Sequence, residues 1–222
     1  MKMNEMDRKY LRQLRDHARD TRTFLSNKMK SERERAVCRA FLRTIGIFFE
    51  ESEIIAPATE PADVLFRTAR FQVRDLLEPD RKRGDYWKKR EQTYLSVGSL
   101  DDVLVPVSLP IALGFDSLVA ELEIVLLAKA QKYKRNYKDW GNQIDALVYV
   151  DLKDRFLAVT SRMPGLDGLK SQGWRSVSLL FSPFGVVLWT SSTAPEFLRG
   201  VPPGPHMEWK DIDTLFEARK SS

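Results

Sequence analysis

The sequence predicts a single α/β domain, because helical and strand patterns alternate along a chain long enough to bury one core. The 222 residues are 43% hydrophobic and 30% charged, a composition typical of a globular domain of this size. Apolar residues recur at helical spacing in some segments and alternate or run together in others. The resulting succession of helical and strand segments indicates one α/β domain over residues 1–222.

The first predicted elements are amphipathic helices. Residues 7–29 place apolar side chains at near-helical spacing among charges, which predicts one or two helices within a basic extension at 1–30. Ser31 and Glu34 match a capping box ahead of an apolar stripe that runs from Val37 to Ile45. Gly46 is expected to end that helix.

The central part of the chain carries the strand patterns. Alternating residues at 62–67 and 71–76 predict two strands, and residues 78–94 form a basic, aromatic loop or broken helix. The longest helix is expected at 116–138. Three further strands are predicted, at 144–152, 177–180 and 186–189. The last segment, 195–222, is a Pro-rich tail with a short helix near 208–218.

Several classes of protein are excluded by what the sequence lacks. The single cysteine, Cys38, provides no disulfide framework. No apolar run approaches the roughly 20 residues of a membrane span, and the first residues lack the apolar core of a signal peptide, so we expect a cytoplasmic protein with no membrane partner. The glycine-rich motifs of nucleotide-binding proteins are absent, which argues against a nucleotide cofactor. His17 and His206 are too isolated to suggest zinc.

The positive charge is concentrated near the N-terminus. The net charge is +5, yet residues 1–43 hold 13 Lys and Arg against six acids, which leaves −2 for the remainder. Such a field attracts phosphate backbones, although a solvated helix explains it equally well. Aromatic and basic residues also mix at 85–90 and 132–137, a pairing that suits nucleic acid but also ordinary packing. The candidate nucleic-acid contacts are Arg74, Arg81, Lys82, Arg83, Lys88, Lys89 and Arg90.

The strands at 62–67 and 71–76 are close enough to form a hairpin. A turn centred on Thr68 and Ala69 would place Phe66 opposite Phe71, and Asp63 opposite Arg74. Because strand side chains alternate, four apolar residues would share one buried face: Val64, Phe66, Phe71 and Val73. The other face would gather Asp63, Leu65, Gln72 and Arg74.

This hairpin resembles the PD-(D/E)xK nuclease superfamily. Pro61-Ala62-Asp63 stands where that pattern has Pro-Asp, Gln72-Val73-Arg74 stands where it has (D/E)-x-K, and Glu34 matches its helical acid. The resemblance implies a restriction-endonuclease-like core, a mixed central sheet flanked by helices in αβββαβ order. Stretches along nearly the whole chain, among them ADVLFRTARFQVRDLLEP and IDALVYVDLKDRF, also look like one family of uncharacterised bacterial proteins described as candidate endonucleases.

The resemblance implies Mg²⁺-dependent hydrolysis of phosphodiester bonds in nucleic acid. Glu34, Asp63 and Gln72 would be the metal ligands. The chain departs from the pattern at Gln72, which brings no negative charge, and at Arg74, which cannot act as a base. Lys129 or Lys132, from the long helix, would supply the missing amine. The implied catalytic residues are therefore Asp63, Gln72, Arg74, Lys129 and Lys132.

A different class of function stays open. The same residues suit a non-catalytic module that keeps the fold and binds nucleic acid or protein. Asp63 and Arg74 would then be a cross-strand ion pair, and Glu34 a capping residue. Convergence of Glu34, Asp63 and Gln72 on one site would favour the enzyme. The sequence does not distinguish DNA from RNA, nor does it reveal the oligomeric state.

Overall fold

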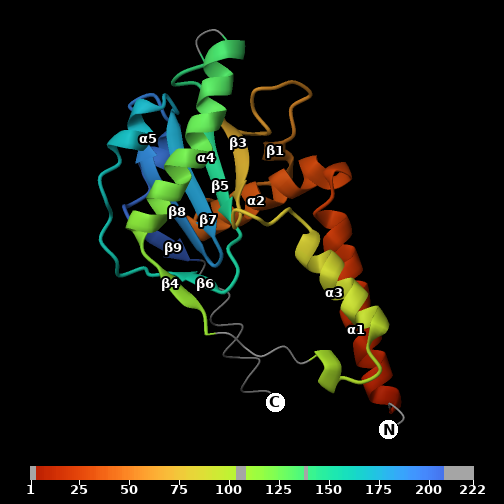
Figure 1. Cartoon of the computed structure of the whole chain (residues 1–222). Helices are drawn as coiled ribbons and strands as arrows, with labels where there is room; N and C mark the ends of the chain where they lie inside the picture. Colours follow the sequence, from red (N-terminus) through yellow and green to blue (C-terminus); the bar gives the residue numbers. More distant parts are fainter. Residues whose placement is uncertain (1–3, 104–108, 138–139, 208–222) are drawn as a thin grey trace. The chain divides into compact units, whose positions relative to one another are not determined.

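A computed structural model describes residues 4–103, 109–137 and 140–207, which form two compact units (Figure 1). We call residues 1–33 with 77–109 the helical unit, and residues 34–76 with 110–222 the sheet unit. The helix α2 (Lys30–Thr44) begins in the first and continues into the second. The predicted helix near 208–218 lies outside the described residues.

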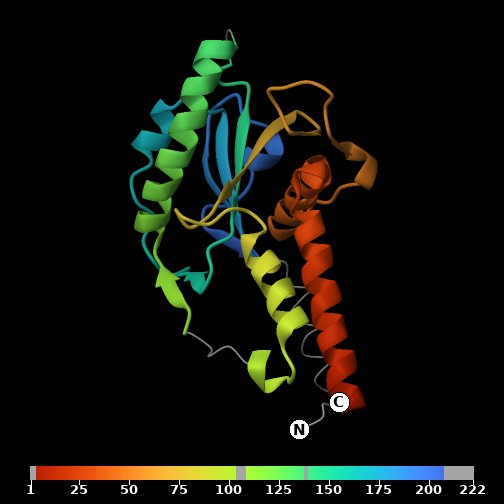
Figure 2. The same ribbon diagram turned by 45° about the vertical axis from the view of Figure 1, so that its right-hand side comes forward.

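The helical unit is a pair of helices, α1 (Glu5–Phe24) and α3 (Asp85–Ser96), lying side by side (Figure 2). Short 3-10 turns accompany them at Asn27–Met29 and Asp101–Val103. Arg22 pairs with Glu91 at 3.0 Å, and the His17 ring meets the Trp87 ring edge-on at 5.2 Å. The helix α1, within the predicted extension at 1–30, therefore packs against a segment from the middle of the chain.

The sheet unit contains a seven-stranded mixed sheet in the order β1-β2-β3-β5-β7-β8-β9. Its strands are β1 (Ile54–Ile55), β2 (Val64–Phe66), β3 (Ala69–Leu76), β5 (Asp145–Val150), β7 (Ser176–Phe181), β8 (Phe184–Thr190) and β9 (Pro205–Met207). The three central strands, β3, β5 and β7, run parallel, and the outer pairs are antiparallel. Two further strands, β4 (Ile111–Leu113) and β6 (Arg155–Leu157), form a separate parallel pair.

Helices cover both faces of this sheet, as the mixed α/β class requires. The long helix α4 (Phe115–Asn136) lies across one face (Figure 1), with Leu118, Leu122 and Leu126 fully buried. The other face packs against α2, where the Phe41 and Phe71 rings meet edge-on at 6.2 Å. Short helices α5 (Asp167–Ser171) and α6 (Glu196–Arg199) complete the unit. No helix among the described residues is long and apolar enough to cross a membrane.

The expected cap at Ser31 and the expected irregular tail after residue 195 are both wrong, whereas the expected end of α2 at Gly46 is confirmed. The helix α2 starts at Lys30, directly after a 3-10 turn, so Ser31 lies inside the helix and cannot cap it. Gly46 does end the helix, in the left-handed conformation that glycine adopts without strain (φ 74°). The Pro-rich tail is more regular than expected, since its described part forms α6 and pairs β9 with β8.

The hairpin register also differs from the expectation. The turn consists of Arg67 and Thr68, so Phe66 pairs with Ala69 and Val64 pairs with Phe71. Arg67 adopts a left-handed conformation (φ 50°), and its side chain is held by Glu53 at 2.9 Å and by the Phe48 carbonyl at 2.9 Å. The shift is two residues, which preserves the parity of the faces. The four predicted apolar residues are therefore buried as expected: Val64, Phe66, Phe71 and Val73.

Candidate functional site

The polar face of β3 lies toward α4. Phe71 and Val73 belong to the core beneath α2, and alternation along the strand turns Gln72 and Arg74 to the opposite face. Gln72 is almost fully buried there, and Arg74 is partly exposed. The face that was expected to carry the polar cluster is thus the one covered by the long helix.

Asp63 meets Gln72, and not Arg74, across the hairpin. This correction follows from the two-residue register shift. The Gln72 amide donates a hydrogen bond to Asp63 Oδ2, which also accepts the Val73 N–H at 3.1 Å. The Asp63 N–H in turn donates to the Phe71 carbonyl at 2.8 Å. A carboxylate and a carboxamide are therefore held together just ahead of β2, where its pairing with β3 begins.

Lys129 of α4 joins this cluster. Burial and the nearby Arg74 guanidinium lower the pKa of Lys129 to about 8, and the charges of Glu60 and Asp63 oppose that shift. The Lys129 Nζ lies 4.5 Å from the centre of the Tyr133 ring, a cation–π contact that holds the amine beside the sheet. Lys132, the alternative amine, is exposed and contributes only to the lowered pKa of Lys129.

Two tyrosines of α4 and of the residues after it fix the segment that leads into Asp63. The Tyr133 hydroxyl donates to the Pro61 carbonyl at 2.7 Å, and the Tyr137 hydroxyl donates to Glu60 Oε2 at 2.8 Å. Burial, together with the Asp63 carboxylate, raises the pKa of Tyr133, which therefore stays protonated and able to donate this bond. The loop before β2 is thus tied to the same helix that carries Lys129.

Arg74 has a guanidinium with no partner among the described residues. Its Nε is buried without a hydrogen bond, and no ion pair to Arg74 occurs in that part of the chain. A guanidinium group that is partly buried without a hydrogen-bond acceptor costs free energy unless an anion binds to it. The arrangement at Arg74 therefore favours an anionic ligand beside Asp63 and Gln72.

Glu34 does not join this cluster. It is buried on α2, one turn before Val37, and α2 packs on the face of the sheet opposite to Gln72. The described residues contain no group of three or more His, Cys, Asp or Glu side chains placed to hold a metal. The oxygen donors that do lie together are Asp63, Gln72 and the Val73 carbonyl, which is 3.4 Å from the Gln72 amide.

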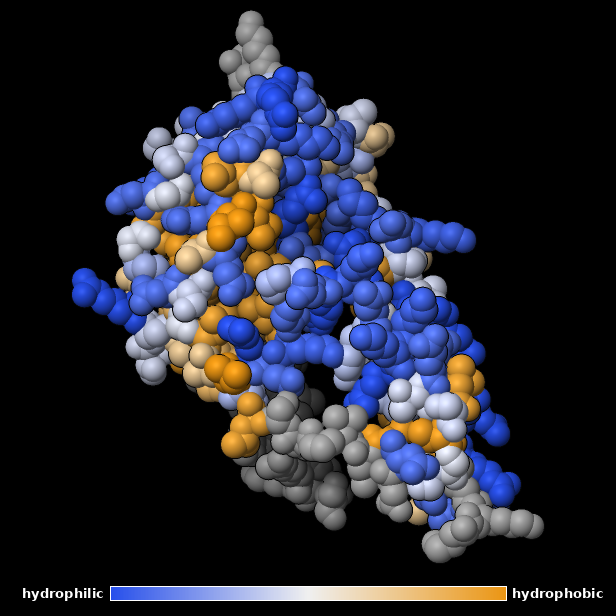
Figure 3. Space-filling view, viewed as in Figure 1, coloured by the Kyte–Doolittle hydropathy of each residue, from blue (hydrophilic) through white to orange (hydrophobic). Residues whose placement is uncertain are grey.

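The other predicted nucleic-acid contacts, apart from Arg74, lie in the helical unit. Lys82, Arg83, Lys88 and Lys89 are exposed. Arg81 is paired with Glu78 at 2.7 Å, and Arg90 lies over the Tyr86 and Tyr94 rings. This unit has 16 Lys and Arg against 11 Asp and Glu, which accounts for the whole net charge of +5. Figure 3 shows hydrophilic side chains over much of its viewed surface.

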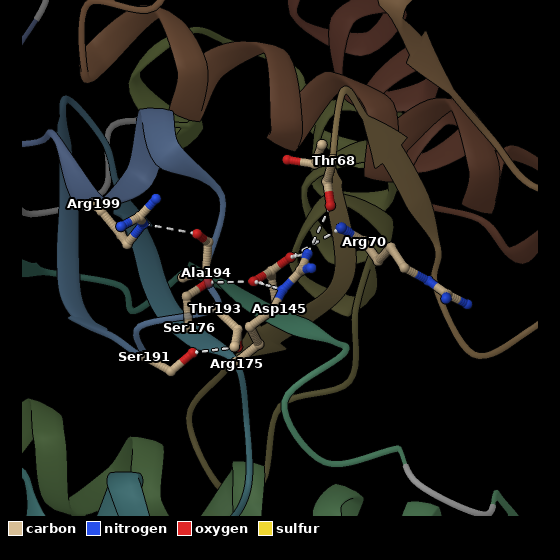
Figure 4. Close-up of polar contacts among 9 residues, drawn as sticks. All are labelled: Thr68, Arg70, Asp145, Arg175, Ser176, Ser191, Thr193, Ala194 and Arg199. Carbon is tan, nitrogen blue, oxygen red and sulfur yellow. Dashed lines mark hydrogen bonds and ion pairs between the residues drawn. The ribbon is translucent and has the colours of Figure 1, made fainter.

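A second polar cluster, which the sequence did not suggest, joins the amino ends of the central strands (Figure 4). Asp145 is fully buried and accepts hydrogen bonds from the Arg70 N–H at 3.0 Å, Arg175 Nε at 3.0 Å and the Ser176 hydroxyl at 2.8 Å. Arg175 also pairs with Asp145 through its terminal nitrogen and donates to the Thr68 carbonyl at 2.8 Å. Every partner is satisfied internally, so we interpret this cluster as structural.

The fold and the site together define a mixed α/β protein whose helix-covered sheet carries a carboxylate, a carboxamide and two cations on one face. The chain belongs to the family described as "Putative endonuclease, protein of unknown function (DUF1780)", whose model matches residues 6–202. A similar solved structure is a protein of unknown function from Pseudomonas aeruginosa strain PAO1, described as a member of the monooxygenase superfamily. It is 31% identical, with a TM-score of 0.65, over 90% of this chain and 94% of the other. No curated protein matches the chain.

Replacing Lys129 with methionine should raise the melting temperature at pH 7. The pKa of about 8 in the folded state lies below the usual 10.5, so the unfolded chain holds this proton more tightly. Stability therefore rises with pH between these two values, and the advantage of the variant should shrink over the same range. Thermal unfolding at several pH values checks this, with the exposed Lys132→Met as the control. A gain that is constant from neutral pH to above 10.5 would contradict the desolvation of Lys129.

Proposed function

We propose that this protein is a metal-dependent phosphodiesterase of nucleic acid with its reaction centre at Asp63, Gln72, Arg74 and Lys129. The observation that carries the proposal is the hydrogen bond between Gln72 and Asp63 on the face of the sheet that also bears Arg74, with Lys129 of α4 close enough for the charges of Asp63 and Arg74 to shift its pKa. The family description, a candidate endonuclease, agrees with this class of reaction.

The order of elements supports the proposed relation to the restriction-endonuclease-like core. Within the sheet unit, α2 is followed by the antiparallel strands β1, β2 and β3, then by α4 and by β5 parallel to β3. This is the αβββαβ order, with β4 and the helical unit's α3 inserted between β3 and α4. In this proposal, Asp63 and the Gln72-Val73-Arg74 segment occupy the hairpin positions of the PD-(D/E)xK motif.

The oxygen donors fit a weak site for a hard divalent ion. Asp63 supplies one carboxylate, and the Gln72 carboxamide and the Val73 carbonyl supply neutral oxygens. The amide of Gln72 presents its nitrogen to Asp63, and rotation by half a turn would present its oxygen to a shared ion. A bound Mg²⁺ or Mn²⁺ would supply positive charge to the phosphate oxygens as the P–O bond breaks. Because Glu34 lies on the opposite face, only two side chains, Asp63 and Gln72, remain as proposed metal ligands, instead of the three that the sequence suggested.

The two cations have separate roles in the proposal. Arg74 binds a non-bridging phosphate oxygen through its unpaired guanidinium. Lys129, with its pKa lowered to about 8, accepts a proton from the water that attacks phosphorus. The leaving oxygen takes a proton from solvent. The basic residues of the helical unit, Lys82, Arg83, Lys88 and Lys89, are proposed as further phosphate contacts.

A second candidate function, the binding of phosphate groups without cleavage, is favoured by one specific contact. The Gln72 amide and the Val73 N–H both donate to Asp63, which satisfies that carboxylate without a metal. In that case Arg74 and Lys129 would bind phosphate groups without cleaving them. The description of the Pseudomonas protein names the monooxygenase superfamily, whereas two cations beside oxygen donors suit a phosphodiester.

Replacing Gln72 with glutamate should strengthen metal binding. The variant places a second carboxylate beside Asp63, so its melting temperature should fall in EDTA and rise with Mn²⁺ more than that of wild type. Cleavage of supercoiled plasmid should need high Mg²⁺ or Mn²⁺ in wild type and less metal in Gln72→Glu with Arg74→Lys, which restores the motif. Thermal shift and plasmid nicking across metal concentrations measure both effects. Identical metal responses in wild type and Gln72→Glu would show that no ion binds at Asp63.

A further inference from the structure

The side chain of Arg70, like that of Arg74, has no partner among the described residues of the sheet unit. Four other arginines there form ion pairs: Arg39 at 3.2 Å and Arg43 at 4.0 Å with Glu51, Arg67 with Glu53 at 2.9 Å, and Arg175 with Asp145. The Arg70 backbone N–H binds Asp145, but its guanidinium makes no hydrogen bond or ion pair among the described residues. Its Nε is buried without an acceptor, like that of Arg74.

Arg70 and Arg74 lie on the same face of β3, on either side of Gln72. Side chains alternate along a strand, so residues 70, 72 and 74 point the same way. Four residues of extended chain separate the two Cα atoms by about 13 Å. Figure 4 shows the Arg70 side chain directed away from the Asp145 cluster. The strand therefore presents two unpaired guanidinium groups, with Gln72 of the proposed reaction centre between them.

We infer that Arg70 binds a second phosphate of a polynucleotide, on the turn side of the phosphate held at Asp63, Gln72 and Arg74. Partly desolvated guanidinium groups gain most from an anion that accepts both of their N–H bonds, and phosphate has that geometry. Side chains stand roughly perpendicular to a strand, so the two guanidinium groups keep about the 13 Å spacing of their Cα atoms, and a ligand that contacts both must continue beyond the reacting group. This inference rests on the proposed function and specifies its substrate class as a phosphodiester chain.

The test compares Arg70→Gln with Arg67→Gln, a matched arginine at the turn that is paired with Glu53. Binding of a short dye-labelled DNA duplex is measured by fluorescence anisotropy in EDTA over a range of salt concentrations. Loss of one charge-assisted contact in Arg70→Gln should raise Kd about tenfold. It should also reduce the magnitude of the log–log salt slope by about 0.9. Arg67→Gln should leave both quantities at the wild-type values.

Hydrolysis of bis(4-nitrophenyl) phosphate separates this inference from the proposed function. That small diester has a single phosphate, so Arg70→Gln should hydrolyse it at the wild-type rate. Duplex binding that is equally strong in wild type and Arg70→Gln, or no duplex binding by wild type, would overturn the role of Arg70. Slower hydrolysis of the small diester by Arg70→Gln would place Arg70 at the reacting phosphate and overturn the second-phosphate assignment. A wild type that binds through Arg70 but hydrolyses no diester would overturn only the proposed function.

Discussion

Replacing Asp145 with alanine should lower the free energy of unfolding by about 3–5 kcal/mol, the usual cost of removing one partner from a buried ion pair. Asp145 is fully buried, and the side chain of its partner Arg175 is only 12% exposed. The substitution would also leave the Arg70 N–H and the Ser176 hydroxyl, which both donate to Asp145, without this acceptor. Because these groups belong to β3, β5 and β7, the loss should weaken the junction of all three central strands.

Urea-induced unfolding measures this effect. Glu53→Ala, which breaks the Arg67–Glu53 pair, provides the control, since both side chains are about a third or more exposed and solvent-exposed ion pairs contribute little to stability. Equal losses in the two variants would mean that the Asp145 cluster does not hold the strands together. A loss confined to Asp145→Ala would establish it as the polar anchor of the sheet.

The faces of the hairpin could be predicted from the sequence, but its register could not. Alternation of Val64 and Phe66 with polar residues fixes which side is buried, whatever the position of the turn. The turn itself depends on Arg67, whose left-handed backbone is supported by Glu53 and the Phe48 carbonyl. Those contacts come from residues 14 and 19 positions earlier, so no local pattern reveals them.

The choice between Lys129 and Lys132 likewise needed the three-dimensional structure. Both lie on the same basic stretch of α4, and the sequence permits either to approach the hairpin. The buried residues of the helix, among them Leu126, Ala130 and Tyr133, define the side that faces the sheet. Lys129 lies beside that side and is partly desolvated, whereas Lys132 is exposed.

Glu34 and Asp145 show where reasoning from motifs fails. Glu34 matches the helical acid of the motif in sequence, but its helix covers the wrong face of the sheet for Gln72. Asp145 opens a buried strand with no visible counter-charge, because Arg175 is 30 residues further along the chain. In both cases the decisive fact is which face of a strand or helix meets which neighbour, and this is set by tertiary packing.

Replacing Asp63 with asparagine should reduce metal-dependent nicking of supercoiled plasmid by about 100-fold or more, since it removes the one carboxylate of the proposed site. Asparagine keeps an oxygen that can accept the Val73 N–H, so the hairpin should remain folded. Lys129→Met should reduce the rate by roughly 10²- to 10⁴-fold, as expected for loss of a general base. Because that variant is expected to be more stable than wild type, its inactivity could not be attributed to unfolding.

The most direct test is the nicking rate of wild type and Asp63→Asn, purified in parallel and assayed with Mn²⁺ and with EDTA. The proposed reaction centre predicts nicking by wild type with Mn²⁺ only, and none above background by Asp63→Asn. Equal nicking by the two proteins would place any nuclease activity elsewhere. A folded wild type that binds DNA but does not nick it at any metal concentration would contradict catalysis at Asp63 and leave a phosphate-binding protein with a nuclease-like site.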